Sequence, residues 1–105
     1  MATAYCERGD DHTWRVLKAL GHPVRLEIVR FIQRHPHCVC NEILLQLPDH
    51  CTRAQSTLSQ HLKILRDAGV IEAEHDGSTT SYLLNEKQIE WLNAQLSNLL
   101  ERVQR

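Results

Sequence analysis

The chain has 105 residues, of which 42% are hydrophobic and 24% are charged, and its formal net charge is −1. This length predicts one globular domain with a modest core, which oligomerisation could enlarge. The balanced charge excludes a general electrostatic affinity for nucleic acid or membranes, so any affinity for DNA must come from local charge.

Several classes of protein are disfavoured by what the chain lacks. No apolar run approaches the length of a membrane span, and residues 1–14 have no signal-peptide hydrophobic region. We therefore expect a cytoplasmic protein whose four cysteines are reduced thiols or metal ligands. We find no nucleophile–base pair, glycine-rich phosphate loop or paired catalytic carboxylates, and we do not expect an enzyme.

Two regions are expected along the chain: a flexible N-terminal arm, 1–12, and a folded domain, 13–105. In the domain, Thr13 is a candidate N-cap for a first helix that Gly21 would end. A second helix would start at His22–Pro23, because proline is favoured at the first helical position. Its apolar face consists of Val24, Leu26, Ile28, Val29, Phe31 and Ile32.

The next two helices are expected to form a helix-turn-helix. His35–Pro36 would stop the second helix, after which a short third helix would cover about 40–47 and a fourth about 53–68. Thr52 and Gln55 fit a capping box at the start of the fourth helix. Its apolar stripe consists of Leu58, Leu62, Ile64, Leu65 and Ala68.

The opposite face of the fourth helix predicts contact with DNA. It carries short hydrogen-bonding side chains where an ordinary solvated face would carry Glu and Lys, and such groups suit the base edges and phosphates of a major groove. A helix rich in Ser and Gln by chance is the alternative. The residues predicted to contact DNA are Arg53, Gln55, Ser56, Thr57, Ser59, Gln60, His61 and Lys63.

A β-hairpin and a last helix complete the expected fold. After Gly69, which stands where a left-handed cap belongs, the apolar period changes to two, and Asp76–Gly77 between extended runs indicates a hairpin. The fold class is therefore mainly α with a small β-hairpin: a winged helix-turn-helix. The last helix, 86–103, has an apolar seam suited to a partner helix, formed by Ile89, Leu92, Leu96, Leu99 and Val103.

The segments LKALGHPVRLEIVRFI, HCVCNEI, STLSQHLKILRDAGVI and HDGSTTSYLL resemble the ArsR/SmtB family of bacterial winged-helix repressors. That family senses arsenic, metals or redox state. The resemblance covers about residues 13–100 and is specific as a whole pattern. It implies a homodimer through the first and last helices, which binds double-stranded operator DNA and releases it when a ligand binds.

Cys38 and Cys40 are the candidate ligands for that signal. In an extended segment, alternate side chains share a face and can direct two sulfurs to one ion. A helix N-terminus lowers a thiol pKa, and thiolates suit As(III), Cd(II), Pb(II), Cu(I) and Zn(II). A third ligand is needed, and the resemblance favours Cys6, because a cadmium- and lead-sensing branch adds an N-terminal cysteine to a matching CVC. Two inert thiols are the alternative.

Other third ligands remain open. Cys51 lies beyond the far end of the third helix, roughly 10 Å away. His35 and His37 would favour Zn(II), Cd(II) or Co(II). The arsenic branch uses a cysteine three residues after CVC, where this chain has Ile43. The family's second metal site maps to residues that cannot form it: Glu86, Gln88, Leu99 and Arg102.

These observations predict a transcriptional repressor that releases its operator when As(III), or Cd(II) or Pb(II), binds Cys38, Cys40 and Cys6. No cofactor is needed for DNA binding itself. A redox sensor of the same fold, in which Cys38 or Cys40 is oxidised, is the main alternative. A thiol metal buffer is a further alternative, although it would not need the polar face of the fourth helix.

Two features depart from the family. The segment LPDHCTRAQ between the third and fourth helices is longer than in the arsenic and cadmium members of the family, and it is expected to be a loop. The hairpin lacks the usual Lys or Arg and is acidic, with Glu72, Glu74 and Asp76, so we expect it to add little charge-driven affinity. Phosphate contacts would then come from Arg15, Lys18, Arg53, Lys63 and Arg66.

Substitutions on the fourth helix should separate affinity from sequence preference. Lys63→Ala should lower affinity for all DNA sequences, because it removes a phosphate contact, whereas changing Gln55 or Gln60 should alter the preference among operators. Fluorescence anisotropy over a series of salt concentrations measures both effects. An unchanged salt dependence in Lys63→Ala would show that the assignment of Lys63 is wrong.

Overall fold

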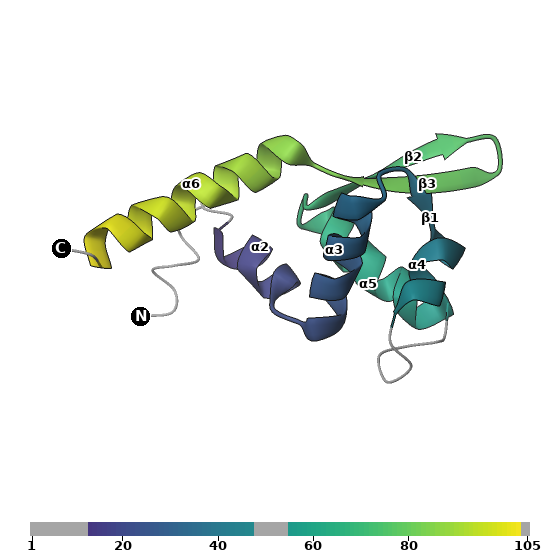
Figure 1. Cartoon of the computed structure of the whole chain (residues 1–105), viewed down its shortest axis with the longest axis horizontal. Helices are drawn as coiled ribbons and strands as arrows, with labels where there is room; N and C mark the ends of the chain where they lie inside the picture. The colour runs from purple at the N-terminus through teal and green to yellow at the C-terminus, as the bar shows by residue number, and fades with distance from the viewer. Residues whose placement is uncertain (1–12, 48–54, 104–105) are drawn as a thin grey trace.

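The computed structural model describes residues 13–47 and 55–103 of the chain. Within these ranges, five helices and a three-stranded antiparallel sheet form a winged helix-turn-helix (Figure 1). The long last helix extends to one side of the other helices and the hairpin extends to the other. The elements are α2 (Thr13–Leu20), α3 (Pro23–Arg34), β1 (Cys38–Val39), α4 (Cys40–Gln46), α5 (Gln55–Asp67), β2 (Ile71–Asp76), β3 (Thr79–Leu84) and α6 (Glu86–Val103).

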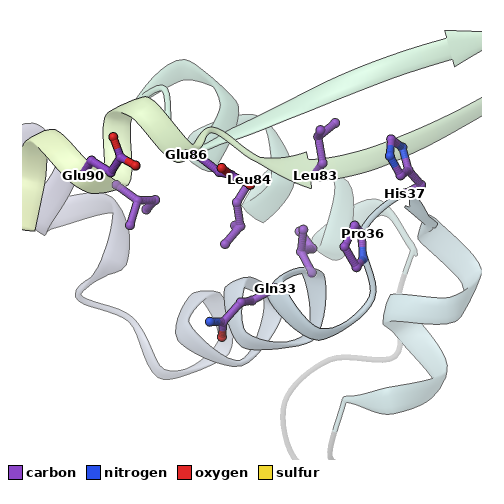
Figure 2. Close-up of a pocket in the computed structure, with 9 residues that line it drawn as sticks. Gln33, Pro36, His37, Leu83, Leu84, Glu86 and Glu90 are labelled. Carbon is purple, nitrogen blue, oxygen red and sulfur yellow. The ribbon is translucent and has the colours of Figure 1, made fainter.

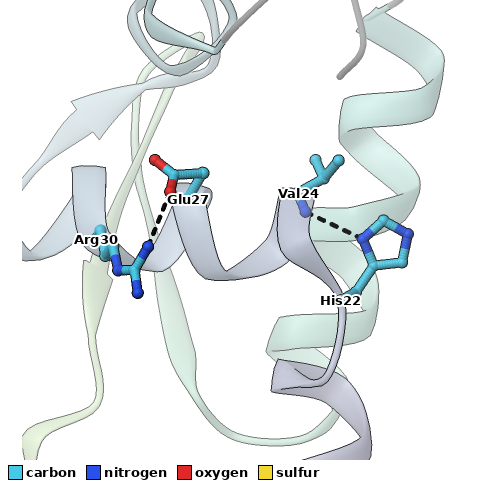
Figure 3. Close-up of polar contacts among 4 residues, drawn as sticks. All are labelled: His22, Val24, Glu27 and Arg30. Carbon is cyan, nitrogen blue, oxygen red and sulfur yellow. Dashed lines mark hydrogen bonds and ion pairs between the residues drawn. The ribbon is translucent and has the colours of Figure 1, made fainter. Parts of the chain in front are cut away.

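Local signals account for most helix boundaries. The side chain of His22 caps α3 by accepting a hydrogen bond from the backbone N–H of Val24 at 3.1 Å, and Pro23 follows at the first helical position (Figure 3). Gly69 has φ +80°, the left-handed conformation that ends α5. The expected boundaries of α3 and α6 and the expected end of α2 are confirmed, whereas Thr13 is the first residue of α2 and not its N-cap. The expected capping box cannot be followed, because Thr52 lies outside the described residues.

The sheet differs from the expected hairpin in two ways. The turn consists of Gly77–Ser78, with Gly77 at φ +63°, and Asp76 pairs with Thr79, so the turn begins one residue later than the Asp-Gly signal placed it. A third strand, β1, also pairs with β3, so that β3 is central. Two residues are too few to show a period of two, which is why the pattern did not reveal β1.

The core joins one face of each helix to the start of β2. Expectation and structure disagree at Leu26 and Ile64, which are 38% and 39% exposed although both were assigned to apolar faces. On α3 the buried positions step by four, which places Leu26 on the other side of the helix. The side chains that are completely buried are Val16, Ile28, Ile32, Ile43, Leu58, Leu65 and Val70.

Helix α6 is buried only along its first half. Leu92 is 7% exposed and packs in the protomer's own core, whereas Leu99 and Leu100 are 56% and 57% exposed. The predicted seam therefore includes both core-facing and exposed positions. On α2, which contacts α6, Trp14 and Leu17 are also exposed. This unpartnered surface agrees with a dimer through the first and last helices. No helix in the described ranges is long and apolar enough to cross a membrane.

Disrupting this surface should dissociate the expected dimer. The double substitution Leu99→Asp with Leu100→Asp should raise the dimer dissociation constant about tenfold or more, because two buried apolar contacts become charged. Sedimentation equilibrium would then report a mass nearer to one chain of 12.1 kDa than to two. Leu45→Asp is the matched control, since Leu45 on α4 is 81% exposed and should leave the mass unchanged. Equal masses for all three proteins would contradict this interface.

Candidate nucleic-acid interface and thiol site

Helix α5 presents its polar face because its apolar stripe is held in the core. Leu58, Leu62 and Leu65 are buried, and they point away from the hydrogen-bonding side chains on the same helix. Ser56, Ser59, Gln60 and Lys63 are exposed, and Thr57 and His61 are half-buried. Among the residues predicted to contact DNA, Arg53 and the side chain of Gln55 lie outside what the structure describes. The exposed set can approach base edges and phosphates.

The basic side chains of Lys63 and Arg15, near the polar face of α5, already contact other side chains of the protein. Lys63 forms an exposed ion pair with Asp67 at 2.9 Å, one helical turn away. Such exposed pairs are weak, so a DNA phosphate can compete with Asp67 for Lys63. Arg15 lies over the ring of Trp14 at 5.4 Å, and with Lys18 it borders a hollow beside the C-terminal part of α5.

The wing carries exposed acidic groups. Glu72, Glu74 and Asp76 all lie on β2 and are exposed. Arg66, at the end of α5, lines the same surface hollow as Glu72 and Glu74, so its charge is partly offset there. This distribution agrees with the expectation that the wing adds little electrostatic attraction for phosphates.

A contact that the sequence pattern did not indicate joins α3 to α5. The Nε atom of Arg25 donates a hydrogen bond to Nδ1 of His61 at 3.2 Å, and the ring of His22 lies 4.9 Å from the ring of His61, centroid to centroid. Burial, followed by the nearby His22 and Arg25, lowers the pKa of His61. A neutral His61 therefore stands on the helix expected to read DNA.

Cys38 is a core residue, not a helix-terminal thiol. It lies on β1, where it is 3% exposed, and the first residue of α4 is Cys40. Burial, with a smaller contribution from the carboxylate of Glu42, raises the pKa of Cys38 to about 11. The expectation that a helix N-terminus would lower the pKa of this thiol is therefore wrong, because burial outweighs it.

Cys40 is half-buried and faces the wing. It lines a hollow of about 320 Å³ together with Tyr82 and the turn of the hairpin. Tyr82 pairs with Cys38 across β1 and β3, and its phenol pKa is raised mainly by burial, with both thiols contributing. Because α4 begins at Cys40, the segment is not extended through both cysteines as expected. The two thiols and the phenol nevertheless lie in one neighbourhood.

Among the residues that the structure describes, no third ligand lies beside these thiols. The ring of His35 packs on Phe31 at 4.5 Å, and Nδ1 of His37 lies 3.1 Å from a carboxylate oxygen of Glu74. His37 also borders a separate hollow of about 430 Å³ between α3, β3 and α6, which contains neither thiol (Figure 2). Within 13–47 and 55–103, no three His, Cys, Asp or Glu residues are grouped to hold a metal ion. Cys6 and Cys51 lie outside those ranges.

Both the sequence and the fold of this chain are similar to those of bacterial regulatory proteins of the ArsR type. A family model described as "Bacterial regulatory protein, arsR family" matches residues 22–73. The arsenical resistance operon repressor of Bacillus subtilis is 41% identical over 76 residues, which cover 71% of this chain and 68% of that protein.

Two solved structures share the fold. An ArsR-like transcriptional regulator from Rhodococcus sp. RHA1 aligns with a TM-score of 0.74 and 19% identity, covering 90% of this chain and 84% of that one. A homodimeric winged helix-turn-helix DNA-binding domain from Mycobacterium bovis aligns with a TM-score of 0.65 and 23% identity, covering 87% and 80%.

The buried thiol should make stability depend on pH in the alkaline range. In the unfolded chain Cys38 loses its proton near its ordinary pKa of 9.0, whereas the folded protein keeps that proton up to about 11. The unfolded state then binds fewer protons, so the free energy of unfolding should fall as pH rises from about 9 to about 11. Urea unfolding of the wild type and of Cys38→Ala at several pH values measures this component. Parallel pH profiles for the two proteins would contradict it.

Proposed function

The chain belongs to the ArsR/SmtB family of bacterial transcriptional repressors, and from this premise we propose that a soft thiophilic ion, As(III) or else Cd(II) or Pb(II), is its inducer. The ion would bind the thiolates of Cys38 and Cys40 and cause release of the operator. Cys6 is the proposed third ligand, on the strength of the resemblance alone. The family's members are DNA-binding regulators rather than enzymes, so the ion acts as a signal and not as a catalyst.

The observation that carries this proposal is where the two cysteines lie. Cys38 belongs to β1, which pairs with the wing strand β3, and Cys40 is the first residue of α4, which packs on the DNA-reading helix α5. Cys40 also lines a hollow that reaches the hairpin turn. An ion that draws these two sulfurs together would therefore disturb the wing and the helix-turn-helix at once.

The donor chemistry fits a soft ion. Two sulfur ligands favour thiophilic ions over hard cations such as Mg²⁺ or Ca²⁺. Because Cys38 is buried, part of β1 must move before its sulfur can act as a ligand. Its raised pKa makes the Cys38 thiolate scarce, which slows oxidation of Cys38 and equally means that an ion must displace the Cys38 proton in order to bind.

Release from DNA should require both cysteines of the pair. The reduced protein is bound to labelled DNA from its own upstream region, and fluorescence anisotropy is followed while arsenite, Cd(II) or Zn(II) is added. Cys38→Ser and Cys40→Ser should keep DNA affinity but lose ion-induced release, shifting the half-effective concentration at least tenfold. Cys51→Ser is the matched control and should respond like the wild type.

The pH dependence of release then distinguishes the ions. Cd(II) displaces the proton of each thiol that it binds, so its affinity should rise about tenfold per pH unit for each proton released. Arsenite binds as As(OH)₃, and each thiol proton leaves with a hydroxide as water, so its affinity should change little over the same range. DNA binding that ignores every ion, or release that survives in Cys38→Ser, would overturn the proposal.

A further inference from the structure

The contact between Arg25 and His61 determines what the DNA-reading helix offers at one position. We propose that Arg25 is a positioning residue that fixes His61 as the Nε2–H tautomer, so that α5 presents a hydrogen-bond donor, and no acceptor, to the DNA there. This inference depends on α5 being the helix that reads DNA. It goes beyond the proposed inducer and does not depend on that ion.

The direction of the hydrogen bond decides the tautomer. A guanidinium group carries only donors and keeps its charge at all relevant pH values. Because Nε of Arg25 lies 3.2 Å from Nδ1 of His61, Nδ1 must be the acceptor, and it cannot carry a proton. The proton of the neutral imidazole is then on Nε2, the nitrogen away from Arg25.

Arg25 is itself held in place by a second helix. Its Nη1 atom donates to the backbone carbonyl of Ala19, in the last turn of α2, at 3.3 Å. The side chain is half-buried, so one guanidinium group connects α2, α3 and α5. A side chain fixed at two of its nitrogens orients its partner ring more strictly than a single exposed contact would.

His22 limits the remaining freedom of the His61 ring. The two rings are 4.9 Å apart, centroid to centroid, at an interplanar angle of 55°. His22 cannot swing away without cost, because its Nδ1 accepts the hydrogen bond that caps α3 (Figure 3). Burial and the neighbouring His22 lower the pKa of His61, and the guanidinium of Arg25 adds to this effect, because protonation would place a hydrogen on Nδ1 facing it.

A fixed donor has consequences for base recognition. In the major groove, guanine N7 and O6, adenine N7 and thymine O4 accept hydrogen bonds, as do phosphate oxygens, whereas the amino groups of cytosine and adenine do not. His61 follows the exposed residues Ser59 and Gln60 on α5. A locked His61 therefore discriminates against a base that offers only an amino group at its contact.

A measurement on the wild-type protein is sufficient to determine the tautomer of His61. A long-range ¹H–¹⁵N spectrum of the reduced protein at neutral pH should show the His61 ring with an unprotonated Nδ1 and a protonated Nε2. Arg25→Met removes the donor while retaining an unbranched side chain, and it should move both nitrogen signals towards the values of a tautomer mixture. Arg30→Met is the matched control, because Arg30 lies on the same helix but pairs with Glu27 at 2.9 Å (Figure 3).

A DNA-binding series tests the consequence. On operators that differ by single base pairs, Arg25→Met should reduce the preference at the pair contacted by His61 roughly three- to tenfold, the range for losing one hydrogen bond. In a His61→Ala background the same substitution should change the preference no further, because the two residues act through one contact. Arg25→Lys, which keeps a donor, should restore part of the effect.

Two outcomes would overturn the inference. One is a wild-type spectrum in which Nδ1 of His61 carries the proton or the two tautomers are mixed. The other is a fall in affinity for Arg25→Met that is equal for every operator, with the His61 signals unchanged, because that result would make Arg25 a structural or phosphate-binding residue. The spectrum of the wild type stands even where a variant folds poorly.

Discussion

Burial of a single leucine stripe, Leu58, Leu62 and Leu65, governs how the rest of the structure works. These side chains pack α5 against α3, α4 and the start of β2. Because one stripe of the helix is buried, the opposite side of α5 must face solvent. The Ser, Gln and Lys residues on the opposite side are thus presented together. The orientation of the polar side of α5 is therefore fixed by the core. Arg25, on the neighbouring helix α3, contacts His61 on this already oriented helix.

A chain of this family with a net charge of −1 would have to bind DNA through local charges and base contacts. Phosphate attraction comes from local groups, and several of these have acidic neighbours: Lys63 pairs with Asp67, and Arg66 shares a hollow with Glu72 and Glu74. A protein arranged in this way has modest charge-driven affinity for arbitrary DNA, so base contacts made by a fixed helix carry more of the discrimination. The proposed tautomer of His61, held by Arg25, would be one such base contact that needs no additional positive charge on the DNA-facing side.

The proposed thiol site would be insensitive until its ligand arrives. Cys38 lies in the core with its pKa raised to about 11, and its strand is hydrogen-bonded to the wing. A ligand that needs this sulfur as thiolate must open the strand, and the free energy of the metal–sulfur bonds would drive that opening. In the proposed mechanism, burial of Cys38 would suppress reaction with weak ligands and would couple the binding of strong ligands to the wing and to α4.

The sequence by itself determined the helices and which side of α5 is polar, because these depend on signals within a few residues: Pro23 at a helix start, Gly69 at a helix end, and an apolar stripe at helical spacing. That this polar side reads DNA stays a prediction. It also singled out Cys38 and Cys40 through their resemblance to a family. Only the tertiary structure decided what depends on residues far apart in the chain. The strand β1 exists because β3 pairs with it, the pKa of Cys38 follows from burial, and Arg25 meets His61 only when α3 and α5 pack. Such contacts leave no local pattern, since each residue is ordinary until packing gives it a neighbour.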